Sequence, residues 1–317
     1  MHSDNCPTFY TDYLNELRTL RKLSPHTLSA YANDLAELAT LAGTTEVSTI
    51  THFDIRKFAS KLHAKGLNAR SIARKLSAWR GFFSWLSEHV SLAANPVDGV
   101  KAPKRAKTLP KALSVDDAVR LVSTKNNAVP TDASAQLCNL AMFELLYSSG
   151  LRISELVGLD VRYTQHAGYA SLGWVDFDAH EVTVTGKGNK MRSVPVGQPA
   201  MDALTRWLTC RDNLIKPTQK DGAIALFISA RGSRMSPRVV QLRLKNHAQM
   251  VGIPVNVHPH VLRHSFASHV LQSSSDLRAV QEMLGHSSIT STQVYTALDF
   301  QHLATVYDAA HPRAKKK

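Results

Sequence analysis

Residues 258–295 read HPHVLRHSFASHVLQSSSDLRAVQEMLGHSSITSTQVY, and they hold several side chains that can act on a phosphate group. His260 and Arg263 stand three residues apart, so they share one face of the helix predicted here. His286 follows a Leu-Gly pair, and Tyr295 lies nine residues farther on. Arginine suits phosphate because its planar group donates two hydrogen bonds to one anion. The stretch therefore indicates a helical domain that handles a phosphate near a tyrosine.

Two more cations stand upstream where they can join this set. Arg152 comes just after Gly150, at which a predicted helix ends, so its side chain can project freely. Lys187 lies in a glycine-bearing turn between residues 181–186 and 191–196, whose alternating pattern predicts a β-hairpin. Cutting a phosphodiester needs an in-line nucleophile, cationic donors to the phosphoryl oxygens and a proton for the leaving oxygen. Each residue alone fits an ordinary structural role, so the interpretation depends on the whole set.

Taken in order along the chain, these residues resemble the tyrosine recombinase (phage integrase) family. Its pattern is Arg, Lys, His-x-x-Arg, His or Trp, and Tyr, and the N-terminal half of the chain also fits the family's helical core-binding domain. The chain departs from the pattern at Ala297, where relatives often have histidine, and in a 163–173 loop that is longer than usual. Neither departure removes a catalytic position. The matching positions are Arg152, Lys187, His260, Arg263, His286 and Tyr295.

The resemblance implies a role for each side chain in cutting DNA. Tyr295 is the nucleophile, which forms a 3′-phosphotyrosyl bond and releases a 5′-hydroxyl. Arg152 and Arg263 hold the non-bridging oxygens, and Lys187 is the general acid for the leaving oxygen. The covalent link keeps the bond energy, so rejoining needs no ATP.

The two histidines of the pattern have supporting roles by the same resemblance. His260 assists proton transfer from the tyrosine, and His286 hydrogen-bonds the phosphate. A metal site is the alternative for this histidine-rich stretch, but the pair His260 and His264 lacks the adjacent glutamate of the zinc-protease motif. The chain also has no Gly-x-x-x-x-Gly-Lys-[Ser/Thr] phosphate loop. We therefore expect neither a metal nor a nucleotide cofactor.

Charge points to nucleic acid independently of the motifs. The formal net charge is +13; residues 1–110 carry 15 basic and 9 acidic side chains, and residues 111–317 carry 23 and 16. Between Ile55 and Ser87 there are eight basic residues and no acidic one. Like charges repel on a helix face unless phosphates neutralise them, which favours DNA binding over a solvated face. The predicted DNA-binding residues are Arg56, Lys57, Lys61, Lys65, Arg70, Arg74 and Arg80.

The predicted fold is mainly α with a small β-sheet or hairpin. An all-helical, SAM-like core-binding domain is expected over 1–95, a basic, proline-containing linker over 96–110, and a mixed α+β catalytic domain over 111–317. The resemblance implies that the two domains form a C-shaped clamp on DNA. The 163–173 segment has no clear periodicity and is predicted to be an irregular loop.

The tail is predicted to be a short helix with one apolar face. Phe300, Leu303, Val306 and Tyr307 have helical spacing, and Pro312 ends the helix. A helix this short needs a groove for its apolar face. By resemblance the groove lies on a neighbouring subunit; a groove on the chain's own catalytic domain is the alternative.

Within the family the chain most resembles the short bacterial recombinases that resolve chromosome and plasmid dimers at cell division. This implies double-stranded DNA at a chromosome-terminus site, a second, related recombinase in a two-plus-two tetramer, and a septal DNA translocase as partners. Alternatives are a phage or transposon integrase, a type IB topoisomerase-like nicking-closing enzyme and a non-enzymatic DNA-binding protein. The scattered cysteines and the lack of a signal peptide or apolar span predict a cytoplasmic protein without membrane contact. These cysteines are Cys6, Cys138 and Cys210.

Overall fold

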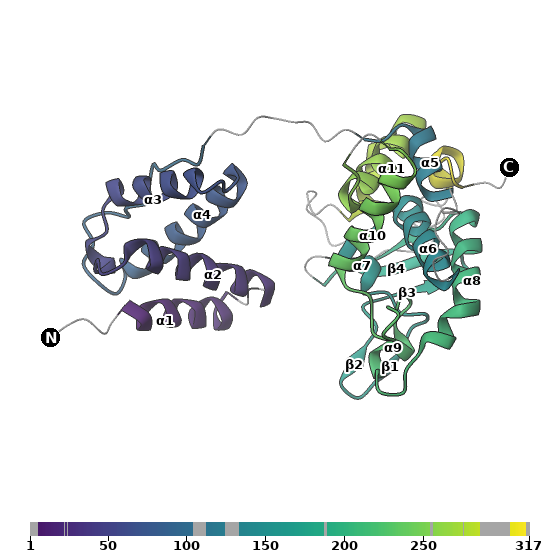
Figure 1. Cartoon of the computed structure of the whole chain (residues 1–317), viewed down its shortest axis with the longest axis horizontal. Coiled ribbons are helices and arrows are strands. Elements are labelled where there is room, and N and C mark those ends of the chain that lie inside the picture. Colours follow the sequence, from purple (N-terminus) through teal and green to yellow (C-terminus); the bar gives the residue numbers. More distant parts are fainter. Residues whose placement is uncertain are drawn as a thin grey trace. The chain divides into compact units, whose positions relative to one another are not determined.

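The chain folds as two compact units, residues 1–108 and 109–317, each with its own hydrophobic core (Figure 1). A computed structural model describes residues 6–21, 23, 25–103, 112–123, 133–186, 189–253, 256–274, 276–285 and 305–314. Among these residues, no helix is both long and apolar enough to cross a membrane. The two units are described separately below.

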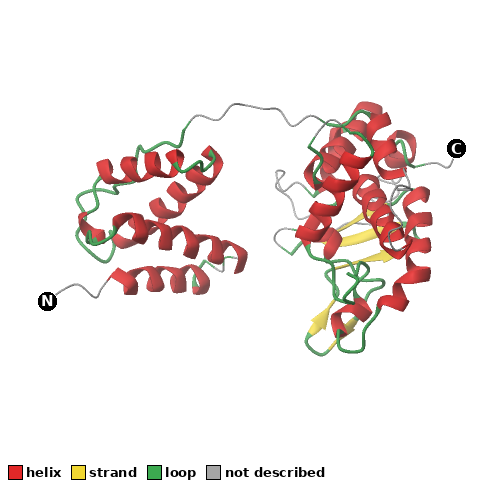
Figure 2. Cartoon of the chain, in the orientation of Figure 1, coloured by secondary structure: helices red, strands yellow, loops and turns green. Residues whose placement is uncertain are grey.

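The first unit is all helical in its described residues (Figure 2). The N-cap Thr51 and Asp54 form a reciprocal capping box at the start of α3 (His52–Ala64). In α4 (Ala69–Leu86) the apolar residues with i, i+4, i+7 spacing form a buried face, which includes Ile72, Leu76 and Trp79. The elements are α1 (Cys6–Thr19), α2 (Pro25–Ala42), the 3-10 helix η1 (Val47–Thr49), α3 (His52–Ala64) and α4 (Ala69–Leu86).

The start of the predicted linker packs onto this first unit. Val97 and Val100 are buried in its core, and Arg80 of α4 donates to both of their carbonyl oxygens, at 3.1 and 3.4 Å. Residues 104–110 of the predicted linker lie outside the described part of the chain. The stretch 96–100 is therefore part of the folded unit and not a free tether.

The second unit places helices around a three-stranded antiparallel sheet of order β3-β4-β5 (Figure 1). In this sheet Val182 pairs with Val175 on one side and with Val194 on the other. The two predicted hairpin segments, 181–186 and 191–196, form β4 and β5. The sequence pattern did not indicate the third strand, β3. The strands are β1 (Gln165–His166), β2 (Tyr169–Ala170), β3 (Gly173–Asp176), β4 (Glu181–Thr185) and β5 (Met191–Pro195).

The helices of the second unit bury one continuous core in which α6 is central. Its residues from Ala141 to Ser149 are all buried, and α8, α10 and α11 pack against it. The helices are α5 (Val115–Ser123), α6 (Ala133–Ser149), α7 (Ile153–Val157), α8 (Gln198–Arg211), η2 (Asp212–Leu214), α9 (Lys220–Ile224), α10 (Pro237–Met250), α11 (Pro259–Ser274) and α12 (Leu277–Leu284).

The prediction that 163–173 is an irregular loop is wrong. The segment forms a two-stranded antiparallel ladder in which Gln165 pairs with Ala170 and His166 with Tyr169. The strands are too short to show a period of two, so the sequence pattern could not reveal them. They are held instead by a buried carboxylate, described below.

Candidate active site

Arg152 is the N-cap of α7, and its position depends on Glu155 one turn along. Glu155 accepts the Arg152 backbone N–H at 2.8 Å, and its other carboxylate oxygen accepts Arg152 Nη1 at 2.8 Å. Arg152 also donates from Nη2 to the carbonyl of Gly285 at 3.3 Å. The arginine is thus held at a helix start by a buried carboxylate, and about a third of its side chain remains exposed.

Arg263 comes from α11 and reaches the same carboxylate. Its Nη1 lies 4.0 Å from Glu155 and donates to the carbonyl of Gly150 at 2.6 Å, while Nη2 donates to the carbonyl of Leu284 at 2.5 Å. Burial, and then the charge of Arg152, lower the pKa of Arg263 to about 10, so it stays charged at neutral pH. The two arginines are therefore close together, and an anion between them would relieve their repulsion.

The Gly150 turn lets the backbone approach Arg263. Gly150 has φ of +58°, and a Cβ at this position would lie 2.4 Å from the ring of Phe266. Only glycine fits both the left-handed conformation and the close packing of α11. The glycine that ends α6 therefore also brings a carbonyl oxygen to the second arginine.

Glu155 is also held by a further residue, Arg192, and the sequence pattern gave neither of these two residues a role. Arg192 of β5 donates to both oxygens of Glu155, at 2.9 and 2.8 Å, and from Nε to the carbonyl of Met283 at 2.8 Å. Burial alone would raise the pKa of Glu155, but the hydrogen bonds from Arg192 and Arg152 hold it below its ordinary value. One carboxylate among three arginines leaves the site with excess positive charge, as a phosphate-binding site requires.

His260 lies on α11 three residues before Arg263, as predicted. Its side chain is exposed, and its ring centre lies 6.1 Å from that of His258. The remaining predicted catalytic residues, Lys187, His286 and Tyr295, lie outside the described residues. The elements that precede two of them are described: β4 ends at Thr185 before Lys187, and α12 ends at Leu284 with Gly285 as its left-handed C-cap before His286.

Residues 305–314 pack on the chain's own catalytic domain. Residues 305–310 are helical, Tyr307 is buried, and its hydroxyl lies 2.6 Å from Ser148 Oγ of α6. His311 stacks on Tyr307 and bonds through Nε2 to the carbonyl of Tyr147 at 3.2 Å. Arg313 donates from Nε to Glu144 at 3.1 Å. For residues 305–314 the groove is thus on the same chain; Phe300 and Leu303 lie outside the described part.

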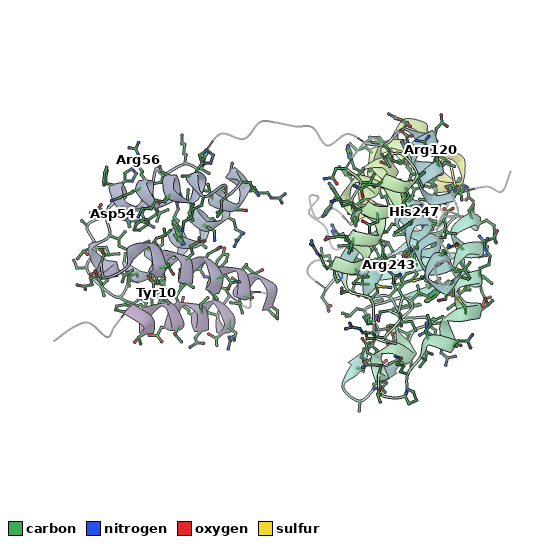
Figure 3. The ribbon with its side chains drawn as sticks, viewed as in Figure 1. Tyr10, Asp54, Arg56, Arg120, Arg243 and His247 are labelled. Atoms are coloured by element: carbon green, nitrogen blue, oxygen red, sulfur yellow. The ribbon has the colours of Figure 1, made fainter. Side chains whose placement is uncertain are left out.

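The predicted DNA-binding residues divide into two groups. The first group is exposed on α3, at its end and on α4, and Arg56 is an example (Figure 3). The other two make contacts within the first unit. Arg74 is also exposed but is ion-paired with the fully buried Asp34, and Arg80 binds the carbonyls of Val97 and Val100. The first group is Arg56, Lys57, Lys61, Lys65 and Arg70.

A basic hollow on α3 adds candidates that the sequence pattern did not single out. It has a volume of about 530 Å³. Its basic lining residues are Arg56 and Lys101, together with His52 and His63, which lie on the same face of α3 as Arg56. The sequence pattern of basic residues included only lysine and arginine. His52 and His63 nevertheless have the spacing that places them on one helix face with Arg56.

Comparison with known proteins settles the family. Residues 111–302 match the phage integrase family, and residues 11–89 match the N-terminal SAM-like domain of phage integrases. The chain belongs to the phage integrase family of tyrosine recombinases. It is therefore a site-specific DNA recombination enzyme that exchanges strands, as the sequence predicted.

Curated relatives of this recombinase span nearly its full length. The tyrosine recombinase XerC 1 of Ralstonia nicotianae is 55% identical over 96% of this chain and 93% of its own. The XerC recombinases of Alcanivorax borkumensis and Pseudomonas aeruginosa are 46% and 45% identical, over 100% and 96% of this chain and 98% and 95% of theirs. This resemblance confirms the prediction of a short bacterial recombinase of the XerC type.

Solved structures agree with the fold. A Tn1549 transposon integrase in complex with a circular-intermediate DNA has a TM-score of 0.70 at 18% identity, over 93% of this chain and 97% of that one. A lambda integrase dimer bound to a core site has a TM-score of 0.65 at 17% identity, over 91% and 98%. The predicted helical N-terminal domain and mixed catalytic domain are therefore confirmed at the level of fold.

Proposed function

We propose that Tyr295 cuts DNA by attacking a phosphodiester held between Arg152 and Arg263. The tyrosine oxygen bonds to phosphorus, the bond to the 5′ oxygen breaks, and Lys187 gives that oxygen its proton. His260 assists the proton leaving the tyrosine, and the site needs no metal, because the arginines supply the cationic donors. The phosphotyrosyl bond keeps the energy of the phosphodiester, so rejoining needs no nucleotide.

One observation supports this proposal most strongly: Arg152 and Arg263, from separate elements, contact the same carboxylate of Glu155. Arginines that repel each other are brought together at a folding cost, which a bound phosphate offsets by forked hydrogen bonds to both. His286, which follows Gly285 in sequence, is proposed as a further hydrogen-bond donor to the phosphate. Gly285 itself accepts from Arg152.

We further propose that the two units form a C-shaped clamp on double-stranded DNA, with the exposed lysines and arginines of α3 and α4 on the phosphates. The partner is a XerD-like recombinase, two copies of each chain forming the tetramer that resolves chromosome and plasmid dimers at a chromosome-terminus site. A septal DNA translocase is the proposed regulator. Docking of the tail on a neighbouring subunit is proposed for residues 299–304 alone, because 305–314 pack in cis.

The test is a suicide substrate, a chromosome-terminus site nicked so that the cut strand cannot be rejoined. With the XerD-like partner present, the chain should accumulate as a covalent protein–DNA band on one defined strand, and binding of the two proteins should be cooperative. A supercoil-relaxing activity that needs no partner and no defined site would instead favour the topoisomerase-like alternative.

A further inference from the structure

The 163–173 segment, which neither the catalytic pattern nor the core requires, is firmly anchored. Tyr169 and Ser171 both donate to Asp160 Oδ2, at 2.7 and 2.5 Å, and Arg234 donates to Asp160 Oδ1 at 2.7 Å. Asp160 is completely buried, so these bonds are not exchanged with water. Figure 1 places β1 and β2 at the end of the second unit beside α9, from which Asp221 also binds Arg234. The β1–β2 hairpin is thus a fixed part of the fold.

The 163–173 segment is also joined to β4, through Leu172, immediately before the turn that carries Lys187. The backbone N–H of Thr185 donates to the carbonyl of Leu172 at 2.7 Å, which extends the β3–β4 ladder one residue past the Gly173–Val184 pair. The ring of Tyr163 contacts that of Trp174 edge-on, with centres 4.9 Å apart. The end of β4 is therefore supported by the 163–173 segment as well as by β5.

The same residues form an apolar shelf beside the turn. Tyr163, Leu172 and Met191 are 51%, 63% and 50% exposed. Together with Trp174 and Thr185 they line an open hollow of about 430 Å³. A hairpin end is flexible unless something packs against it, because its last residues have few contacts. The shelf lies beside both strand ends, since Thr185 ends β4, Met191 begins β5, and both line the same hollow as Tyr163 and Leu172.

We propose that Tyr163 and Leu172 are positioning residues, which fix the ends of β4 and β5 and so hold Lys187 in place to donate its proton. The inference rests on the proposed role of Lys187 as general acid. General acids must be within hydrogen-bond reach of the atom that takes the proton, and a misplacement of about 1 Å can slow a reaction about 100-fold. Residues that set the strand ends therefore control the rate of proton donation without touching DNA.

The test compares two substrates that differ only in the leaving atom. In one the 5′ oxygen is normal; in the other it is replaced by bridging sulfur. A thiol has a pKa of about 8.5 and leaves as the thiolate without a proton, whereas an alkoxide requires the acid. The substitution Tyr163→Ala, alone and with Leu172→Ala, should slow cleavage of the normal substrate about 10- to 100-fold. Cleavage of the sulfur substrate should be unchanged.

Three variants make the result decisive. Tyr163→Phe, which keeps the ring, should cleave both substrates as the unmodified protein does, and Val115→Ala, an exposed apolar residue of α5, controls for loss of apolar surface. Lys187→Ala should cleave the normal substrate slowly and the sulfur substrate at the rate of the unmodified protein. If it cleaves the sulfur substrate slowly as well, the assignment of Lys187 as general acid is wrong. If sulfur restores Lys187→Ala but Tyr163→Ala is equally slow on both substrates, or slow on neither, the positioning proposal is overturned. Circular dichroism verifies that each variant is folded.

Discussion

Arg192 holds Glu155 by both carboxylate oxygens, at 2.9 and 2.8 Å, although the two residues are 37 positions apart. Each side chain is only 4% exposed. This buried pair connects β5 to α7, and through Glu155 it fixes the geometry of Arg152. The arginine pair proposed to bind the phosphate is therefore built on a third arginine that is almost completely buried.

Removal of Arg192 should destabilise the catalytic unit strongly. In Arg192→Met, Glu155 keeps Arg152 but loses its bidentate partner in a buried setting. Breaking such a pair costs about 3–5 kcal/mol. Urea unfolding measures the loss, and Arg278→Met, which removes an exposed pair with Glu282, should cost less than about 1 kcal/mol. Equal effects of the two substitutions would show that Glu155 does not depend on Arg192.

Gly197→Ala should release the tail from its own domain. A Cβ at Gly197 would lie 1.9 Å from the carbonyl oxygen of Arg313 and 2.8 Å from the hydroxyl of Tyr307, so the segment 305–314 cannot remain where it is. Limited proteolysis should then cut within 305–314 much faster than in the unmodified protein, while Gln198→Ala, its neighbour, should have no such effect. Unchanged proteolysis would mean that the tail is not held at Gly197.

Acid should weaken the tail anchor through His311. Burial lowers its pKa to about 3, whereas an unfolded histidine has about 6.5. Above pH 6.5 the His311 side chain is neutral in both the folded and the unfolded chain, so it does not lower the free energy of unfolding. Below it the unfolded chain binds a proton that the folded chain cannot, so stability falls as the pH drops toward 3, by up to about 1.4 kcal/mol per pH unit.

Thermal unfolding at pH 7.5 and 5.0 measures this effect. His311→Gln keeps a donor for the Tyr147 carbonyl but cannot titrate, so it should lose less stability on acidification than the unmodified protein. His247 and His269, whose pKa values burial also lowers, are present in both proteins and contribute equally. An identical loss in the two proteins would exclude His311 as the source.

DNA affinity should depend on salt through the exposed residues of α3. Each phosphate contact removed lowers the log–log slope of affinity against salt by about 0.9. Arg56→Ala and Lys61→Ala should each reduce the slope by about that amount. Arg80→Ala should leave the slope near its original value and lower the stability of the first unit, because Arg80 holds the Val97 and Val100 carbonyls. The opposite pattern would place Arg80 on DNA.

The sequence predicted what depends on local spacing. The hairpin around Lys187 and the His260–Arg263 pair are both local patterns that a short window contains. The Glu155–Arg192 pair and the Asp160 network were missed because they join residues far apart in the chain. The sequence alone also does not show whether a carboxylate is buried or exposed. The order of the catalytic residues predicted the family although three of them lie outside the described structure.

The central claim is that Tyr295 is the nucleophile, and trapping on a nicked suicide substrate tests it most directly. Tyr295→Phe removes only the phenol oxygen, so it should abolish the covalent protein–DNA band while DNA binding stays within about twofold, an energy near 0.4 kcal/mol. The unmodified chain, assayed beside it, should give the band. A covalent band of undiminished intensity with Tyr295→Phe would contradict the account and assign the attack to another residue.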